Sequence, residues 1–286
     1  MSLVVAYATE DGPRLVSDTR VTLRDGQRSS YKTGSLKAVV LNPKFSICFA
    51  GDVLSGLRGI RKCAALLAVG ESAAALLTTL TALTVDKHVE FLVAQGGGGP
   101  QLARVREGSV EHDLSTAWIG DHKAFARFQQ ERLSSDPLEA TLSAGMRASS
   151  RAMHRLQRAM HAVIADPAIA SVGDFCVSVA YKDTGFEYLS SIFIHVGRDI
   201  QVQDGDNLID KMAHPVEEGG YSVSVVEPAH AGTPALGLSF PRARLGMIYL
   251  PLLFDGAEVL HNVSPKDFSR VVLERFGVAM KDPPLR

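Results

Sequence analysis

The sequence predicts an α+β fold of four layers, in which two antiparallel sheets pack face to face between outer helices. Short β-type runs open the chain, a strongly helical stretch fills its middle, and β-type runs return after Pro167. A chain of 286 residues, 46% of them hydrophobic, is long enough to bury one large core. We expect one domain over residues 2–200 and a C-terminal extension over 201–286 that packs on this domain or on a neighbouring subunit.

The N-terminal elements are expected to be short strands, because runs of β-branched and apolar residues lie between turn residues. Asp52 stands where it can cap a helix that begins near Val53. A second helix is expected over 72–83. The strands expected here cover residues 3–8, 14–17 and 21–23, a hairpin of 37–41 and 45–50, and then 89–94, 101–106 and 115–120.

The middle of the chain repeats its apolar residues at three- and four-residue spacing, which predicts helices over 122–133 and 137–164. Strands are then expected over 175–181, 186–196 and 221–226, and a last helix over 265–276. The four glycines at 96–99 lack the lysine and following helix of a phosphate-binding loop, so they indicate a flexible hairpin.

Charge and composition narrow the class of partner. The formal net charge of −1 gives no broad basic field, so we expect neither nucleic acid nor a membrane surface as a partner. No basic-then-apolar secretory signal opens the chain, and no apolar run is long enough to span a membrane.

Cysteine and histidine usage give two further expectations. The three cysteines, Cys48, Cys63 and Cys176, form no CxxC pair and lie in apolar stretches, which fits a reducing cytoplasm. The nine histidines show no metal-ligand spacing, so we expect no metal and no other cofactor.

Ser2 is the candidate nucleophile. Methionine aminopeptidases remove Met1 before a small residue, and this would leave Ser2 with both a hydroxyl and a free α-amine that can act as its base. Asp18 follows sixteen positions later, at the end of an expected strand. If Met1 is retained, the amine is locked in a peptide bond and Ser2 is inert.

Five segments in this order resemble a proteasome β-type subunit, closest to the bacterial branch that includes the HslV protease subunit and the ancestral proteasome homologues. They are Ser-Asp-Thr-Arg-Val-Thr-Leu at 17–23, Lys37, Cys-Phe-Ala-Gly at 48–51, Trp-Ile-Gly at 118–120, and Ser-Val-Gly-Asp-Phe-Cys-Val at 171–177. The resemblance covers roughly residues 2–185 and implies the four-layer αββα sandwich of the N-terminal nucleophile (Ntn) hydrolases.

The resemblance also implies a catalytic site. Asp18 would hold Lys37 close to Ser2, where its positive charge disfavours protonation of the Ser2 amine. The backbone N–H of Gly51 would face the oxyanion of the tetrahedral intermediate. Phe49 and Val53 would line an apolar pocket for the substrate side chain before the scissile bond.

The chain departs from the family pattern at several positions. Gly120-Asp121-His122 stands where many active members have Gly-Ser-Gly, and Ile169 and Val172 stand where eukaryotic-type catalytic subunits have aspartate and serine. Asp121 is expected to cap the following helix, with polar support of the site as the alternative. Lys32 is a rival to Lys37, but it lies in a polar loop rather than at the start of an apolar strand.

Together with the resemblance, these residues predict an N-terminal-serine amide hydrolase, a peptidase that takes peptide or protein substrates. The resemblance implies assembly as a homo-oligomeric ring or open spiral, and it leaves open whether an unfoldase or another accessory protein is a further partner. Two alternatives stay open: a catalytically inactive, proteasome-like self-assembling scaffold or binding protein, and a small-amide Ntn acylase. A basic stripe on the long helix, with Arg147, His154, Arg155 and His161, fits a solvated face, or else a contact with a neighbouring subunit or an acidic partner.

Overall fold

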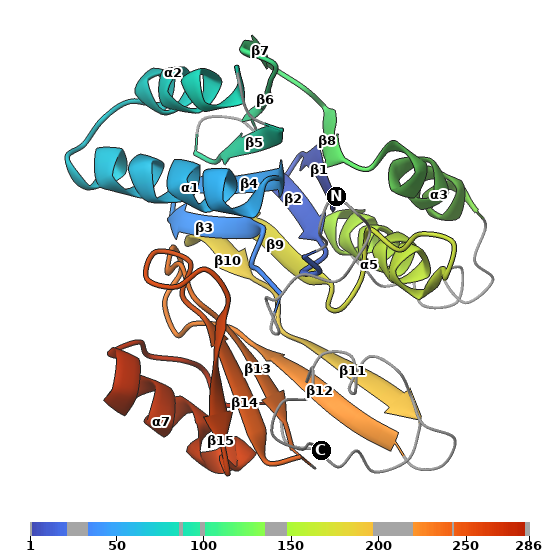
Figure 1. Ribbon diagram of the computed structural model, residues 1–286, viewed down its shortest axis with the longest axis vertical. Helices are drawn as coiled ribbons and strands as arrows, with labels where there is room; N and C mark the ends of the chain where they lie inside the picture. Colours follow the sequence, from blue (N-terminus) through green and yellow to red (C-terminus); the bar gives the residue numbers. More distant parts are fainter. Residues whose placement is uncertain are drawn as a thin grey trace.

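The computed structural model describes residues 2–21, 34–85, 88–97, 101–134, 148–196, 220–241 and 243–283 (Figure 1). Over these residues the protein is a mixed α+β structure with five helices and three antiparallel sheets. Several expected features lie outside them: most of the strand at 21–23, Lys32, Gly98 and Gly99, Arg147, and the start of the helix at 137–164.

The first sheet has the strand order β10-β9-β2-β1-β8, and each neighbouring pair is antiparallel. Its residues alternate between two buried faces, as a pleated strand requires, so that Val4 faces one side while Leu3 and Val5 face the other. The strands are β1 (Leu3–Thr9), β2 (Gly12–Ser17), β8 (Thr116–Gly120), β9 (Val177–Lys182) and β10 (Gly185–Tyr188).

The second sheet has the order β3-β4-β5-β6-β7 and is antiparallel throughout, with two helices inserted in the chain between β4 and β5. The hydroxyl of Tyr188 on β10 joins it to the first sheet, because it donates to the carbonyl of Ala38 at 3.3 Å and accepts from the amide of Val40 at 3.0 Å. The strands are β3 (Ala38–Asn42), β4 (Phe45–Gly51), β5 (Val89–Gln95), β6 (Gln101–Arg106) and β7 (Ser109–Glu111).

Helices α1 (Val53–Ala68) and α2 (Ala73–Thr84) cover the second sheet (Figure 1). Gly56 and Gly59 bring α1 so close to the sheet that a Cβ at either position would overlap the ring of Phe49 or Phe91. The expected cap is confirmed, since Asp52 accepts a hydrogen bond from the amide of Ser55 at 2.8 Å.

Helices α3 (His122–Leu133) and α5 (Ala148–Ala165) cover the first sheet (Figure 1). Leu3, Val5 and Val16 form one buried cluster with Phe128 of α3 and Leu156 of α5. A larger buried cluster holds the opposite face of the first sheet together with the second sheet, and this places the main core between them.

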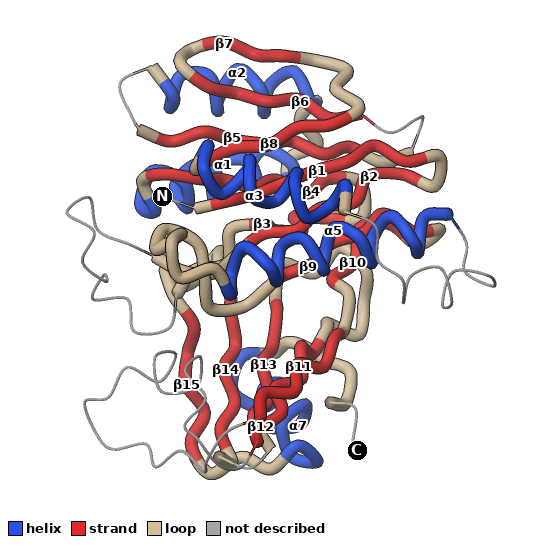
Figure 2. The backbone as a smooth tube through the Cα atoms, turned by 90° about the vertical axis from the view of Figure 1, so that its right-hand side faces the viewer, coloured by secondary structure: helices blue, strands red, loops and turns tan. Residues whose placement is uncertain are grey.

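The C-terminal part forms a third sheet with the order β11-β12-β13-β14-β15, which Figures 1 and 2 place at one end of the molecule. Leu238 and Met247 face the main core, whereas Val226 and Ile248 face a separate cluster under helix α7 (Pro265–Phe276). The strands are β11 (Ser191–Val196), β12 (Gly220–Val226), β13 (Leu236–Phe240), β14 (Leu245–Tyr249) and β15 (Ala257–His261).

The single strand expected over 186–196 is wrong, because the chain forms two strands there. β10 ends at Tyr188, and the amide of Leu189 then bonds to the carbonyl of Ser178 at 2.9 Å before the chain crosses to the third sheet at Ser191. The division expected at residue 200 stays a prediction, and the third sheet already begins with β11.

Candidate functional site

Ser2 lies directly before β1 and is buried, with 4% of its surface exposed. Its carbonyl oxygen accepts a hydrogen bond of 2.7 Å from the amide of Asp121. Gly120 makes room for this approach, because it has φ +104° and a Cβ there would overlap the same carbonyl. The chain is therefore tightly held immediately after the candidate nucleophile.

The Asp18 carboxylate is buried and collects hydrogen bonds on both oxygens. Oδ1 accepts from the amide of Leu3 at 3.1 Å. Oδ2 accepts from the amides of Arg20 at 3.1 Å and Gly173 at 3.2 Å, and from Nζ of Lys37 at 2.9 Å. A buried charge must be compensated by hydrogen bonds or by an opposite charge. These bonds fix Asp18 next to Leu3, the residue that follows Ser2.

Lys37 forms a buried ion pair with Asp18, with side-chain exposures of 1% and 0% respectively. Its Nζ also donates to the carbonyl of Arg20. Burial lowers the pKa of Lys37 because it removes the ammonium from water, and the adjacent Asp18 carboxylate opposes that shift. The structure thus brings together the expected Asp18 and Lys37 at the start of β1.

Two of the segments that carry the family resemblance contact each other at this point. Arg20 forms an ion pair of 3.3 Å with Asp174, and the amide of Phe175 donates to Oγ1 of Thr19 at 3.1 Å. Gly173 lies under the Arg20 guanidinium, where a Cβ would overlap it. The expected strand at 175–181 therefore starts later, at Val177, because the amide of Phe175 bonds to Thr19 instead of a strand partner.

Gly51 ends β4 and is exposed, with φ +100°. A Cβ at this position would overlap the carbonyl of His88, which accepts the amide of Asp52 at 2.8 Å. The preceding residue, Ala50, has its Cβ 3.3 Å from where a Cβ on Gly120 would lie. Gly51 therefore lies near the Ser2 end of the first sheet, and its glycine leaves the backbone open to a ligand.

The two expected substrate-binding residues differ in exposure. Phe49 is fully buried beneath Gly56 and belongs to the main core. Val53 begins α1 and is half-buried. Of these two, only Val53 reaches the surface, and the pocket role of both stays a prediction.

Asp121 caps α3 as expected, because its Oδ1 accepts from the amides of Lys123 at 2.8 Å and Ala124 at 3.1 Å. Its Oδ2 also accepts a hydrogen bond of 2.6 Å from Ser171. Burial raises the pKa of Asp121, but the hydrogen bonds from Ser171 and the two amides outweigh it and hold the pKa below its usual value.

The sequence interpretation missed Ser171 as a neighbour of the site. Its position beside Gly173-Asp174 was the only available signal, and nothing in sequence spacing shows that this turn reaches Asp121.

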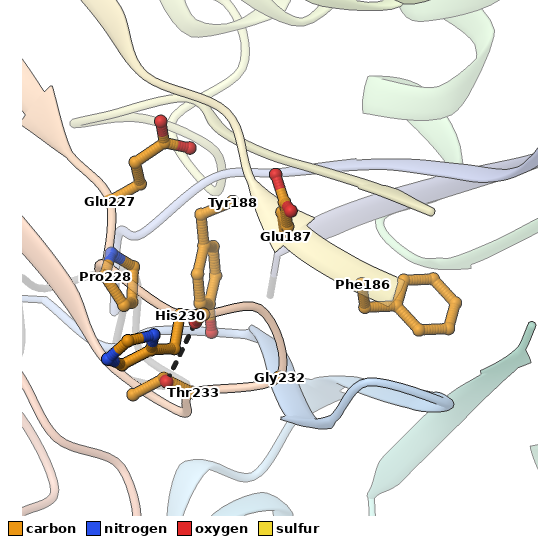
Figure 3. Close-up of a pocket in the computed structure, with 8 residues that line it drawn as sticks. All are labelled: Phe186, Glu187, Tyr188, Glu227, Pro228, His230, Gly232 and Thr233. Carbon is orange, nitrogen blue, oxygen red and sulfur yellow. Dashed lines mark hydrogen bonds between the residues drawn. The ribbon is translucent and has the colours of Figure 1, made fainter. Parts of the chain in front are cut away.

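A separate small pocket lies between β10 and the loop that follows β12 (Figure 3). The hydroxyl of Thr233 donates to the carbonyl of His230 at 2.9 Å inside it. The space is about that of a single water molecule, so it is too small for a peptide. Its lining consists of Phe186, Glu187, Tyr188, Glu227, Pro228, His230, Gly232 and Thr233.

Within the described ranges, no cluster of three or more histidine, cysteine or acidic side chains is arranged to bind a metal ion. In the same part of the chain, no helix has the length and apolar character needed to cross a membrane. No known protein family matches the sequence, and no curated protein matches it either.

Proposed function

We propose that the protein is a proteasome-like N-terminal-serine amide hydrolase, a peptidase that acts through Ser2 once Met1 has been removed. The observation that carries this proposal is the buried Lys37–Asp18 ion pair of 2.9 Å, whose carboxylate also binds the amide of Leu3 at 3.1 Å. It supplies a charged pair beside the residue that would carry both nucleophile and base.

The fold supports the same proposal. Two facing antiparallel sheets lie between the helix pairs α1/α2 and α3/α5 (Figures 1 and 2). We take this arrangement as the αββα sandwich of the Ntn hydrolases, with the third sheet and α7 as its C-terminal extension.

The proposed reaction begins when the Ser2 amine accepts the hydroxyl proton and Oγ bonds to the amide carbon of the substrate. The carbonyl π electrons move to oxygen, where the backbone N–H of Gly51 stabilises the oxyanion. The oxyanion then re-forms the carbonyl, the C–N bond breaks, and the leaving amine takes the proton from the Ser2 ammonium. Water repeats these steps on the acyl-enzyme and releases the acid.

Lys37 would act on the Ser2 amine through its charge. A nearby ammonium disfavours a second positive charge, so the amine is kept as a free base, and Asp18 keeps Lys37 in place. Neither residue has to exchange a proton in this mechanism.

Intact-mass measurement of the purified chain tests the first requirement, since the proposal expects Met1 to be absent. A peptide epoxyketone tests the second requirement, which is a nucleophile and a base on the same residue. Its adduct forms only when one residue supplies a hydroxyl to the ketone and an amine to the epoxide. We expect a single adduct on Ser2, none with Ser2→Ala, and strongly reduced labelling with Lys37→Met. Lys44→Met is the matched control, because Lys44 is exposed on the same hairpin.

Retention of Met1 or an adduct that survives Ser2→Ala would contradict the proposal. Retained Met1 would favour the inactive scaffold. Turnover of small amides without any turnover of peptides would favour the acylase.

Assembly into a homo-oligomeric ring or spiral is part of the proposal. Its support is apolar surface on α1, where Leu54 is 56% exposed and Val69, just after the helix, is 77% exposed. Negative-stain microscopy of the purified chain distinguishes a ring, a spiral and a monomer.

A further inference from the structure

We propose that Glu90 of β5 is a positioning residue for Ser2, which it holds in place through the backbone of Gly120 and Asp121. This inference rests on the proposed function of Ser2. It gives the second sheet a part in the site beyond the oxyanion role of Gly51.

Glu90 is a half-buried acidic residue of β5, between the buried Val89 and Phe91. The ring of Phe91 lies under Gly59 of α1, so the Phe91 side chain faces the helices. Successive side chains of a strand point to opposite faces, and Glu90 therefore faces the first sheet. A carboxylate in this place requires a hydrogen-bond partner.

The partner of Glu90 is the backbone of β8, because its Oε2 accepts the Gly120 amide at 2.8 Å. β8 is the last strand of the first sheet, and the next amide, that of Asp121, bonds inward to the Ser2 carbonyl at 2.7 Å. Consecutive amides of a strand point to opposite edges, so the Gly120 amide points outward. Glu90 thus supplies the acceptor that a further strand would otherwise give.

The Gly120-Asp121 segment needs such contacts from outside. Gly120 has φ +104°, and glycine has more conformational freedom than any other residue, so this backbone does not hold its own shape. Glu90 fixes the Gly120 amide, and Ser171 fixes the Asp121 carboxylate at 2.6 Å. The Asp121 amide lies between these two anchors in the chain, and a shift of Glu90 is therefore passed to the Ser2 carbonyl that this amide binds.

The same contact joins the two halves of the proposed site. Glu90 is the cross-strand partner of Ala50, which precedes Gly51. The Cβ of Ala50 lies 3.3 Å from where a Cβ on Gly120 would lie. Glu90 thus fixes the spacing between Gly51, the proposed oxyanion donor, and the backbone of Ser2, and nucleophilic attack depends on that spacing.

Glu90→Met is the test variant, because it keeps an unbranched side chain of similar length and removes the acceptor. Glu90→Gln is the rescue variant, since its amide oxygen can still accept the Gly120 amide. Arg104→Met is the matched control on the same edge of β8, because Arg104 donates to the carbonyl of Trp118 at 3.3 Å, two residues before Gly120.

The first measurement is the concentration dependence of Ser2 labelling by the epoxyketone, which separates noncovalent binding from the rate constant of adduct formation. With Glu90→Met we expect this rate constant to fall about tenfold, because the nucleophile is displaced relative to Gly51. The dissociation constant of the noncovalent complex should stay the same. Glu90→Gln should recover most of the rate, and Arg104→Met should react like the wild type.

The second measurement is amide hydrogen exchange, which does not require an active enzyme. In Glu90→Met we expect the Asp121 amide to exchange about tenfold faster, since its bond to the Ser2 carbonyl is loosened. Glu90→Gln should restore its protection, and Arg104→Met should leave it unchanged. If the wild type is not labelled but this exchange pattern appears, the proposed function fails and the support by Glu90 stands.

Three outcomes would overturn the positioning role. One is unchanged exchange of the Asp121 amide in Glu90→Met. Another is labelling of Glu90→Gln as slow as that of Glu90→Met, since this would assign the effect to the charge of the carboxylate and not to its hydrogen bond. The last is an equal rate loss in Arg104→Met, which would reflect a general loosening of β8.

Discussion

Asp18 and Asp121 bind the two polar atoms of one peptide group, the one that joins Ser2 to Leu3. Oδ1 of Asp18 accepts the Leu3 amide at 3.1 Å, and the amide of Asp121 donates to the Ser2 carbonyl at 2.7 Å. Because both polar atoms have partners from distant segments, this peptide cannot rotate without breaking two buried hydrogen bonds. The candidate nucleophile is therefore attached to a fixed backbone.

Removal of either partner of the buried Asp18–Lys37 ion pair should destabilise the protein. Asp18→Asn or Lys37→Met alone leaves one buried charge unpaired, and we expect each to lower the free energy of unfolding by about 3–5 kcal/mol. The double variant should lose clearly less than the sum. Urea unfolding of the four proteins in this cycle measures the coupling, and additive losses would show that the two groups do not interact.

The steric role of Gly120 next to the Ser2 carbonyl can be distinguished from the general cost of a left-handed backbone conformation. Gly120→Ala and Gly70→Ala each place a side chain at positive φ, which costs about 1–2 kcal/mol, but only Gly120 has the Ser2 carbonyl in the way. We expect Gly120→Ala to be more destabilising by at least ~1 kcal/mol and to slow Ser2 labelling. Thermal unfolding checks the first point, and equal losses in the two variants would contradict it.

Because folding lowers the pKa of Asp121, the free energy of unfolding should depend on pH in the acid range. Its contribution is present above the unfolded value of 3.8 and is lost as the pH falls through the lower folded value. As the pH falls below about 4, the free energy of unfolding should decrease more steeply in the wild type than in Asp121→Asn, which keeps a capping side chain.

Ser171→Ala provides the intermediate case for Asp121, because it removes one of the hydrogen bonds to the carboxylate. The acid dependence of its free energy of unfolding should lie between those of the wild type and Asp121→Asn. Parallel curves for all three would show that Asp121 is not the group responsible.

The cysteines should resist thiol reagents while the protein is folded. Burial raises the pKa of the Cys63 and Cys176 thiols to about 12, and it raises that of Cys48 as well. At pH 8 only about one thiol in 10⁴ would then be the reactive thiolate. Titration with a chromogenic disulfide should detect no fast thiol in buffer and three in urea, whereas a fast thiol in buffer would contradict the observed packing.

Local signals predicted much of the fold. The helix over 122–133 and the helix over 265–276 have the expected bounds, because Asp121 and Ser264 cap their first turns. The hairpin of β3 and β4 was also expected, since the Asn42-Pro43 turn separates two apolar runs. In each case a few neighbouring residues determine the structure.

The rest depended on contacts between distant segments. In the third sheet, the sequence predicted the strand at 221–226 and, merged with β10, the run that contains β11, but not β13, β14 or β15. Strand propensity depends on pairing and burial, which local sequence does not show. Asp18 and Lys37 could be named as partners from the motif, and they do meet. Ser171 could not be named as a partner of Asp121, because the two residues lie far apart in sequence.

The bond between the Gly173 amide and Asp18 also has a consequence in time. A ribosome makes the chain from its N-terminus, so the segment with Ser2 and Asp18 emerges long before Gly173. Processing of Met1 requires only the first residues, whereas the Asp18 carboxylate gains the last of its hydrogen-bond partners once Gly173 has been made. The order of translation thus leaves the amino terminus exposed for processing before the second half of the chain completes the hydrogen bonds of Asp18.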